Sequence, residues 1–433
     1  MNKISMALMM GSSTFMELPP VSTWWVDLPD NATYYYQHCF DSNNNYFSSL
    51  TGANGWTADV TKVNDTATLI QKYTIGTSTN ARTFNYISTD TAGNFYICGT
   101  ISTFPTTYVH LAKYDSSMVK QWEKTVQSGA GEGLAVRGIF VDASSNVCLV
   151  FVSGDSNGIG SVMLSKFDTS GTVLFHRKIT ATGTGSGIDS YSEVSIGSDS
   201  SNSTYLAFND NATYSGMYGY VVKYTSTGTL SWQRKFTSTY GGMVSGLAVT
   251  PAGDVYVTRE VTNVSFGYQS SLIKLNTSGT VQWTRWYSPD SSGSGNNSYV
   301  TLDAGGNIYW TFQSIADEKI VFKLDSTGAI IYSRLVTTAG MSSIALSPNG
   351  HMAFVSSLLG YTLKVPTDGS KANATYGGNN YSSVSYTLQT TANTTVATTT
   401  ELTATTPTMT VTNTTLNTIT GPTTITPNFG YVR

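Results

Sequence analysis

The sequence predicts an all-β fold, a seven-bladed β-propeller of four-stranded antiparallel blades, and two observations support this prediction. The stretch from Leu247 to Tyr287 reads as four short strands separated by turns, because apolar and polar residues alternate and β-branched and aromatic residues dominate. The same pattern then recurs along the chain at a spacing of roughly 40–55 residues, which is typical of propeller blades.

The repeat is defined by a lysine between apolar residues, an aromatic residue nine positions later, and Lys or Arg two positions after that. In the fifth copy these residues are Lys274, Trp283 and Arg285. The lysines that mark the seven copies, of which the first and last are weaker, are Lys62, Lys113, Lys166, Lys223, Lys274, Lys323 and Lys364. An active site on a propeller is usually made once, whereas this lysine recurs in every copy. We therefore interpret it as structural and expect its amine to contact backbone carbonyls or solvent.

The ring needs a closing strand, because the last copy stops at Pro366 before a fourth strand appears. The segment Val21–Val26 has a fourth-strand pattern but no blade of its own, so we predict that it completes the last blade by pairing with Tyr361–Val365. Trp25 precedes Tyr35, in the next strand, by the same number of residues as Tyr332 precedes Ser342 in the sixth copy. We therefore expect Trp25 to be the counterpart of Tyr332. A lone apolar strand in an extended arm is the alternative.

Three regions follow from this division: an N-terminal arm over residues 1–20, the propeller over 21–368 with 21–26 as its closing strand, and a Thr-rich extension for assembly over 369–433. The arm begins with the apolar stretch Met1–Met10, which resembles a signal peptide but lacks an A-x-A cleavage site, and we interpret it as a docking segment.

The Thr-rich extension has isolated apolar residues at a spacing close to seven, yet its threonines and prolines argue against a coiled coil. Alternation such as that of Met409–Thr412 favours extended strands. So few apolar residues cannot build a core, so the extension should be ordered only against a partner, a copy of itself or its own propeller. A disordered linker is the alternative. The isolated apolar residues are Leu388, Val396, Leu402, Met409, Leu416 and Ile425.

The composition is typical of extracellular and viral structural proteins, because only 11% of the residues are charged, against roughly 25% in ordinary domains. The net charge of −3 provides no basic stripe, so we expect no nucleic-acid partner. No run of 18 apolar residues occurs, so we expect no membrane insertion. Cys39, Cys98 and Cys148 fall in different copies, which favours buried free thiols over disulfides.

The sequence contains no recognisable constellation for catalysis, so we predict no enzyme activity, no cofactor and no metal site. The four histidines, His38, His110, His176 and His351, lie in different copies without metal-ligand spacing. The turns of the type Asp303–Asn307 resemble calcium loops, but they lack the twelve-residue ligand spacing, and Asx-turns account for their Asp and Asn.

The loops between strands two and three and between blades vary in length, and variable loops on a rigid scaffold are where binding usually resides. Aromatic and Met residues in these loops are typical of interfaces or of sugar stacking. The alternative is that each packs locally under its own loop. The candidate partner-binding residues are Tyr214, Met217, Tyr218, Tyr240, Met243, Phe266 and Tyr268.

The pattern Lys-Tyr-x-Ser-x-Gly-x-x-x-Trp-Gln-Arg at Lys223–Arg234 resembles the propeller repeats of virion proteins from tailed bacteriophages, particularly marine and cyanobacterial phages. The end of the chain, with Val365–Ser370, Tyr376–Gly378 and a Thr-rich seven-residue repeat, is similar to the end of such proteins. The resemblance covers Thr61 to the C-terminus and implies a structural component of the virion, often in or on the tail, without catalytic residues. Quinoprotein dehydrogenases are also propellers, but their tryptophan docking motif, adjacent cysteines and acidic calcium cluster are missing from this sequence.

These observations predict a non-enzymatic, tail-associated structural protein of a phage virion whose propeller loops present a partner- or receptor-binding face. Its expected partners are other virion proteins, further copies of itself, and a host-surface glycan or protein. The alternative is a secreted propeller that binds or degrades glycans. A pocket with paired carboxylates would favour the degrading enzyme, and the loop carboxylates available for one are Asp210, Asp317 and Glu318.

Overall fold

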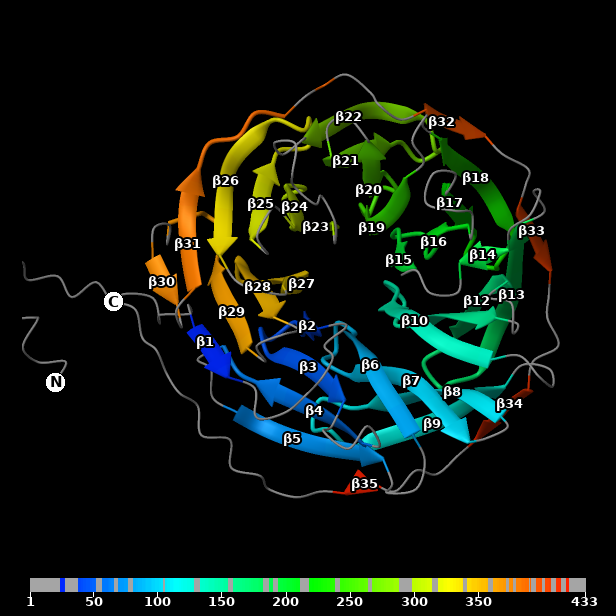
Figure 1. Ribbon diagram of the computed structural model, residues 1–433. Coiled ribbons are helices and arrows are strands. Elements are labelled where there is room, and N and C mark those ends of the chain that lie inside the picture. Colours follow the sequence, from blue (N-terminus) through cyan, green and yellow to red (C-terminus); the bar gives the residue numbers. More distant parts are fainter. Residues whose placement is uncertain are drawn as a thin grey trace, which may run out of the picture.

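The computed structural model shows the predicted seven-bladed β-propeller, with seven four-stranded antiparallel sheets arranged around a central axis (Figure 1). All regular elements of the described residues are strands. The residues that the structure describes are 24–27, 38–51, 57–65, 69–76, 81–103, 106–127, 133–154, 159–181, 187–189, 194–210, 218–237, 242–263, 267–287, 298–313, 318–337, 341–356, 361–370, 374–376, 379–388, 390, 395–398, 402–405, 410–413 and 418–419.

Each blade runs outward from the axis, and its strands follow one another in sequence except at the closure of the ring. The strands are, in blade 1, β2 (His38–Phe40), β3 (Tyr46–Thr51), β4 (Thr57–Val63) and β5 (Leu69–Gly76); in blade 2, β6 (Ala81–Thr89), β7 (Phe95–Thr103), β8 (Thr106–Tyr114) and β9 (Lys120–Gln127); in blade 3, β10 (Gly133–Val141), β11 (Val147–Gly154), β12 (Ile159–Phe167) and β13 (Val173–Ala181), with β14 (Ile188–Asp189) pairing with β12; in blade 4, β15 (Ser195–Ser198), β16 (Thr204–Asn209), β17 (Gly219–Tyr224) and β18 (Leu230–Thr237); in blade 5, β19 (Met243–Val249), β20 (Val255–Asn263), β21 (Gly267–Leu275) and β22 (Val281–Tyr287); in blade 6, β23 (Tyr299–Leu302), β24 (Ile308–Gln313), β25 (Lys319–Leu324) and β26 (Ile330–Thr337); and in blade 7, β27 (Met341–Ser347), β28 (His351–Ser356), β29 (Tyr361–Pro366) and β1 (Trp24–Asp27).

The core lies between neighbouring blades, because the alternating apolar residues of each sheet pack against those of the next sheet. One cluster joins Cys98 and Leu111 of blade 2 to Leu149 and Phe151 of blade 3, and all four side chains are fully buried. Burying a side chain of this size contributes about 1.5–3 kcal/mol, so the ring is stabilised at each blade interface.

The ring closes through an N-terminal strand, as the sequence predicts, because β1 pairs antiparallel with β29 and completes blade 7. Residues 21–23 of the predicted closing strand lie outside the described residues. The prediction that Trp25 is the counterpart of the recurring aromatic residue was wrong by one position. Trp24 lies opposite Lys364, whereas Trp25 lies opposite Leu363. Counting from the next strand assumes a constant connection length, whereas the register is set by the ladder itself.

The recurring lysine, aromatic and arginine fasten each blade to a turn of the next blade. Lys113 Nζ and Trp122 Nε1 of blade 2 both donate to the carbonyl of Thr169 in blade 3, at 3.4 and 3.0 Å. In blade 4, Trp232 Nε1 donates to the Thr277 carbonyl and Arg234 Nε to the Gly279 carbonyl, at 3.0 and 2.7 Å. The lysine amines of Lys62, Lys166 and Lys323 also donate to carbonyls of the following blade, which confirms their structural interpretation.

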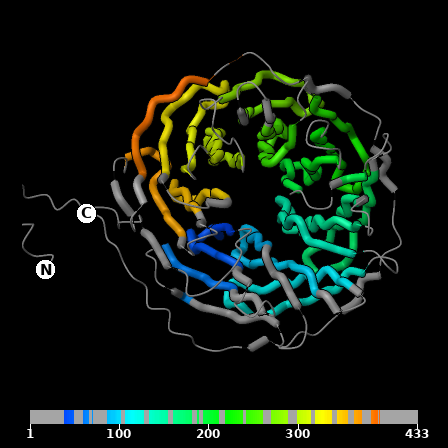
Figure 2. Tube along the Cα trace, viewed as in Figure 1, coloured from blue at the N-terminus to red at the C-terminus, as the bar shows by residue number. Residues whose placement is uncertain are grey.

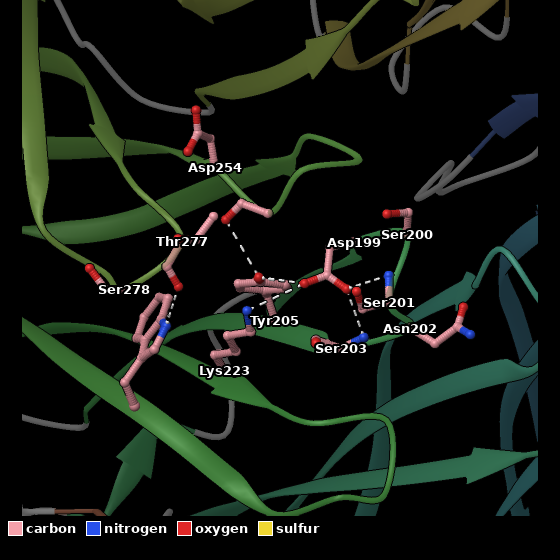
Figure 3. A network of polar contacts seen from close by, with 12 residues as sticks. Asp199, Ser200, Ser201, Asn202, Ser203, Tyr205, Lys223, Asp254, Thr277 and Ser278 are labelled. Carbon is pink, nitrogen blue, oxygen red and sulfur yellow. Dashed lines mark hydrogen bonds and ion pairs between the residues drawn. The ribbon is translucent and has the colours of Figure 1, made fainter.

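The turn aspartates complete this polar network (Figure 3). Asp199 Oδ1 accepts hydrogen bonds from the backbone N–H groups of Ser201 and Ser203, so the carboxylate stabilises its own turn. Asp199 Oδ2 accepts from the Tyr205 hydroxyl at 2.8 Å and lies 3.4 Å from Lys223 Nζ. At Asp303–Asn307, the Asn307 N–H donates to Asp303 Oδ1 at 2.9 Å and Asn307 Nδ2 donates to Asp303 Oδ2 at 2.8 Å, which confirms the Asx-turn explanation of the calcium-like turns there.

The C-terminal extension adds strands to the outside of the propeller, and it passes the blades in reverse order (Figure 1). β31 (Asn379–Val384) pairs with the outer strand of blade 6 and carries β30 (Ala374–Tyr376) on its other edge. The remaining strands pair with the outer strands of blades 4, 3, 2 and 1, and they are β32 (Thr395–Thr398), β33 (Leu402–Thr405), β34 (Thr410–Asn413) and β35 (Thr418–Ile419).

The last four strands begin seven, eight and eight residues apart. The near-heptad spacing of the extension is therefore the spacing of one strand and one connection per blade. The sequence left open whether the extension folds against a partner, a copy of itself or its own propeller. Its described strands pair with the outer strands of its own propeller. The N-terminal arm, residues 1–20, and the last fourteen residues, 420–433, lie outside the described residues.

Candidate functional site

The two faces of the ring differ in how their strands are joined. On one side, the turns between the first and second and between the third and fourth strands of the described blades are tight, as in Asp199–Ser203, where the Asn202 N–H donates to the Asp199 carbonyl at 3.0 Å. We call this side the tight-turn face. On the other side the second and third strands extend as hairpins, and β20 and β21 remain paired as far as Asn263 opposite Gly267. We call this side the hairpin face.

Most of the predicted partner-binding residues cannot be placed within the hairpin face. Tyr214, Met217, Tyr240 and Phe266 lie outside the described residues. Tyr268 belongs to β21, and its backbone pairs with Thr262 near the tip of the blade 5 hairpin. The remaining two residues, Tyr218 and Met243, are placed with their side chains.

Tyr218 packs locally and is half-buried. Its N–H donates to Asp210 Oδ1 at 2.8 Å, and Lys235 Nζ lies 3.8 Å from the centre of its ring. The ring also packs against the apolar cluster between blades 3 and 4. Met243 is half-buried at the start of β19, opposite Glu260. The observed contacts of Tyr218 therefore agree with the alternative in which the residue packs under its own loop.

The loop carboxylates do not form a pair among the described residues. Asp210 is 4% exposed and serves its own loop, because it accepts the Tyr218 N–H and lies 3.5 Å from the Tyr220 hydroxyl. Glu318 belongs to blade 6, and Asp317 lies outside the described residues.

A buried polar cluster below the hairpin face was not predicted from the sequence. Arg259 is fully buried, and burial lowers the pKa of its guanidinium to about 10. Glu260 Oε1 accepts the Ser298 N–H at 3.0 Å, which ties blade 5 to the start of blade 6. Gly242 has φ of +145°, and a Cβ there would lie 2.8 Å from Arg259 Nη2. The adjacent Arg and Glu inside a strand, in a chain with few charged residues, are the sequence signal that would have revealed this cluster.

The histidines and cysteines occupy separate blades, as the sequence predicts. His176 Nδ1 shares a 2.7 Å hydrogen bond with Ser165 Oγ, and His351 Nδ1 lies 3.0 Å from Asn349 Oδ1. Within the described part of the chain, no three His, Cys, Asp or Glu side chains gather as a metal site. The three thiols are free, and burial raises the pKa of Cys148 to about 11.

The tight-turn face has a hollow of about 560 Å³ between the turns of blades 1, 2, 6 and 7. Its carboxylates are occupied by their own turns, since Asp41 Oδ1 accepts the N–H groups of Asn43 and Asn45, and Asp90 behaves in the same way. The large apolar side chains that the described residues expose lie at or just before the starts of outer strands, near this face, and they are Ile70, Val119, Leu174, Val281 and Ile331.

Comparisons with known proteins identify no family for this chain. No family model and no curated protein matches the chain. Among solved structures, a protein of unknown function from Dyadobacter fermentans has a TM-score of 0.44 at 11% identity, over 72% of this chain and 97% of that one. Sqt1 of Chaetomium thermophilum has a TM-score of 0.42 at 8% identity, over 80% and 99%. BBS1N, solved in complex with ARL6DN, has a TM-score of 0.45 at 8% identity, over 79% and 96%. In the part of the chain that the structure describes, no helix is long and apolar enough to cross a membrane.

Proposed function

We propose that this protein is a non-enzymatic structural component of a bacteriophage virion, associated with the tail, and that its hairpin face binds a partner or a host-surface receptor. The observation that carries the proposal is the difference between the two faces: tight, stereotyped turns on one side and long hairpins of unequal length on the other. A rigid ring that presents variable loops is a common design for recognition.

The repeat residues are occupied by contacts between blades, which fits our proposal that the protein has a structural role and is not an enzyme. The lysines, aromatics and arginines of the repeat bind turn carbonyls of the next blade and hold the ring together. A low charge content and the resemblance of Lys223–Arg234 to phage virion repeats point in the same direction. The proposed partners are other virion proteins, further copies of this chain, and a glycan or protein of the host surface.

Mass spectrometry of purified particles tests the first part of the proposal. We expect the chain to be present at a fixed stoichiometry relative to the major virion proteins, and to remain with the particles through a density gradient. Its absence from particles, together with its recovery from the secreted fraction, would overturn the virion assignment and favour the secreted glycan-binding alternative.

Adsorption of variant phage tests the second part. Replacing Phe266, which immediately precedes β21 in the sequence, and Tyr268 of β21 with Ser should slow adsorption to host cells about tenfold, since aromatic residues often dominate interfaces. Ser117→Glu, at an exposed position on the tight-turn face, is the matched control and should leave adsorption unchanged. Normal adsorption of the hairpin variant, with slow adsorption of the control, would assign binding to the opposite face.

A further inference from the structure

The junction where the ring closes holds a polar cluster that departs from the repeat. Figure 2 shows blade 1, in blue, next to blade 7, in yellow and orange, and Lys364 of β29 reaches across this junction to the Asp65 carboxylate of blade 1. Asp65 lies three residues after the repeat lysine Lys62, at a position where the six other copies have Ser or Thr. In blades 2, 3 and 7, the backbone carbonyl at this position accepts the lysine of the preceding blade. In blade 1 a carboxylate accepts it instead.

The same carboxylate also contacts a carboxamide. Asn349, in the turn between β27 and β28, donates from Nδ2 to Asp65 Oδ1 at 3.0 Å, and Lys364 Nζ contacts the same oxygen. Lys364 is fully buried, and its Nζ lies 5.7 Å from the centre of the Phe40 ring. A single proton acceptor therefore lies between an amine and an amide.

Two groups polarise the carbonyl of the Asn349 amide. Ser347 Oγ accepts the His351 N–H at 3.1 Å and directs its own proton to Asn349 Oδ1, 2.5 Å away. His351 Nδ1 lies 3.0 Å from the same oxygen and donates to it in the Nδ1–H tautomer. Donors aimed at an oxygen that becomes negative stabilise a tetrahedral intermediate. Ser347 and His351 replace the Asp and Asn of turns such as Asp303–Asn307, so this arrangement is a departure of blade 7 from the repeat.

The two charged groups are suited to act as nucleophile and base. Burial lowers the pKa of the Lys364 amine, although Asp65 opposes this shift, and the neutral amine is the form that attacks a carbonyl. Burial alone would raise the pKa of Asp65, but hydrogen bonds from Lys364 and Asn349 hold it below its usual value. Asp65 is therefore a carboxylate that can accept a proton from the amine.

We propose that the side chains of Lys364 and Asn349 form an intramolecular isopeptide bond. Lys364 Nζ attacks Asn349 Cγ and forms the new C–N bond, while negative charge develops on Oδ1 beside its two donors. Asp65 accepts a proton from Nζ and delivers it to Nδ2, so the bond between Cγ and Nδ2 breaks and ammonia leaves. The reaction needs no oxidant and no further reactant. The product ties the turn before β28 to β29, the strand that pairs with β1 at the closure, and it does not depend on the proposed virion role.

Blade 3 contains the same three residue types and provides an internal comparison. Lys166 Nζ lies 2.7 Å from Asp142 Oδ2, which also accepts a hydrogen bond from Asn146 Nδ2 at 3.1 Å. The Lys166 amine donates in addition to the Asn202 carbonyl, and within the described residues no donor contacts Asn146 Oδ1. Because the polarising donors are missing there, we expect Lys166 to remain an unmodified amine.

Mass spectrometry of the wild-type, full-length protein after trypsin digestion tests the proposal without depending on a variant's folding. Asn349 and Lys364 lie on one tryptic peptide, so the bond should give a looped peptide over residues 335–371 that is lighter by one ammonia and uncut after Lys364. The Gly350 N–H can also react with the Asn349 amide and release ammonia, although it donates to the Ser347 carbonyl at 3.1 Å. That reaction leaves Lys364 open to trypsin, so a linear peptide that ends at Lys364 would overturn the proposal.

Variants test the assigned roles. Lys364→Arg keeps the charge without the amine and should give the linear peptide, whereas Lys166→Arg makes the same exchange in blade 3 and should retain the loop. Asp65→Asn removes the base and should also prevent the bond. Ser347→Ala should slow its formation after synthesis at least tenfold, since loss of one oxyanion donor has effects of this size or larger. Formation of the loop at the wild-type rate in both Asp65→Asn and Ser347→Ala would overturn the mechanism.

Discussion

Trp24 lies opposite Lys364 in the ladder that joins the two ends of the propeller, and the same pairing joins Lys113 to Trp122 and Lys223 to Trp232 inside blades 2 and 4. Lys364 is fully buried and its Nζ hydrogen-bonds Asp65 Oδ1 of blade 1, just as other repeat lysines contact the blade that follows them. The closure therefore repeats the geometry of an ordinary blade, although its outer strand comes from the other end of the chain.

Removing residues 1–26 should lower the melting temperature clearly, because it deletes three of the four residues of β1 and exposes the edge of β29. We expect a loss of about 2–4 kcal/mol, which corresponds to a shift of at least several degrees for a domain of this size. Differential scanning calorimetry measures the shift. A truncation of residues 1–20 is the control and should melt like the full chain, so equal melting curves for both truncations would contradict a stabilising closure.

Gly279→Ala should destabilise the protein more than Gly306→Ala, although both glycines have nearly the same positive φ, +77° and +79°. The shared backbone strain costs about 1–2 kcal/mol. A Cβ at Gly279 would also lie 3.0 Å from the Arg234 guanidinium, whereas a Cβ at Gly306 meets no atom within 4 Å. Urea unfolding of the two variants isolates the contact with Arg234 as the difference between them. Equal losses of stability would show that the arginine moves aside without cost.

The stability of the ring should fall on acidification in a way that depends on His38. Burial lowers its pKa from 6.5 to about 4, so the unfolded state binds more protons between these values, and the free energy of unfolding rises with pH across that window. Acidification from pH 6.5 to 4 removes about 3 kcal/mol through this group. His38→Gln should have a correspondingly shallower slope of unfolding free energy against pH, measured in chloride buffers. Parallel slopes for the two proteins would show that the imidazole titrates normally in the folded state.

The sequence predicts the fold because the contacts that define it are repeated at fixed spacing. Lys223, Trp232 and Arg234 lie on paired strands of one blade and bind the next blade, so their spacing reflects the blade itself. Trp25 was misassigned because its position was inferred from the length of the connection to the next strand, and that length does not fix the pairing register. The surface on which the C-terminal extension folds remained open, because it depends on which strands meet in three dimensions. The binding residues were the least predictable, since a side chain such as Tyr218 can pack locally or present itself with the same sequence pattern.

The C-terminal extension should resist proteolysis in the isolated monomer, because its described strands pair with the propeller's own outer strands. Ordering each residue costs about 1–2 kcal/mol, and the sparse apolar residues alone do not offset this cost. The ladders to β18, β13 and β9 supply the missing hydrogen bonds, and Tyr386 adds a ring contact of 5.1 Å with Tyr287 where the extension passes blade 5. Limited proteolysis followed by mass spectrometry should therefore find slow cleavage within residues 395–413.

Val396→Pro, inside β32, should accelerate cleavage there, since proline cannot donate to a ladder. Thr399→Pro, next to that strand, is the control and should cleave like the wild type. Rapid cleavage of the wild-type monomer, with protection only in an assembled particle, would show instead that a partner orders the extension.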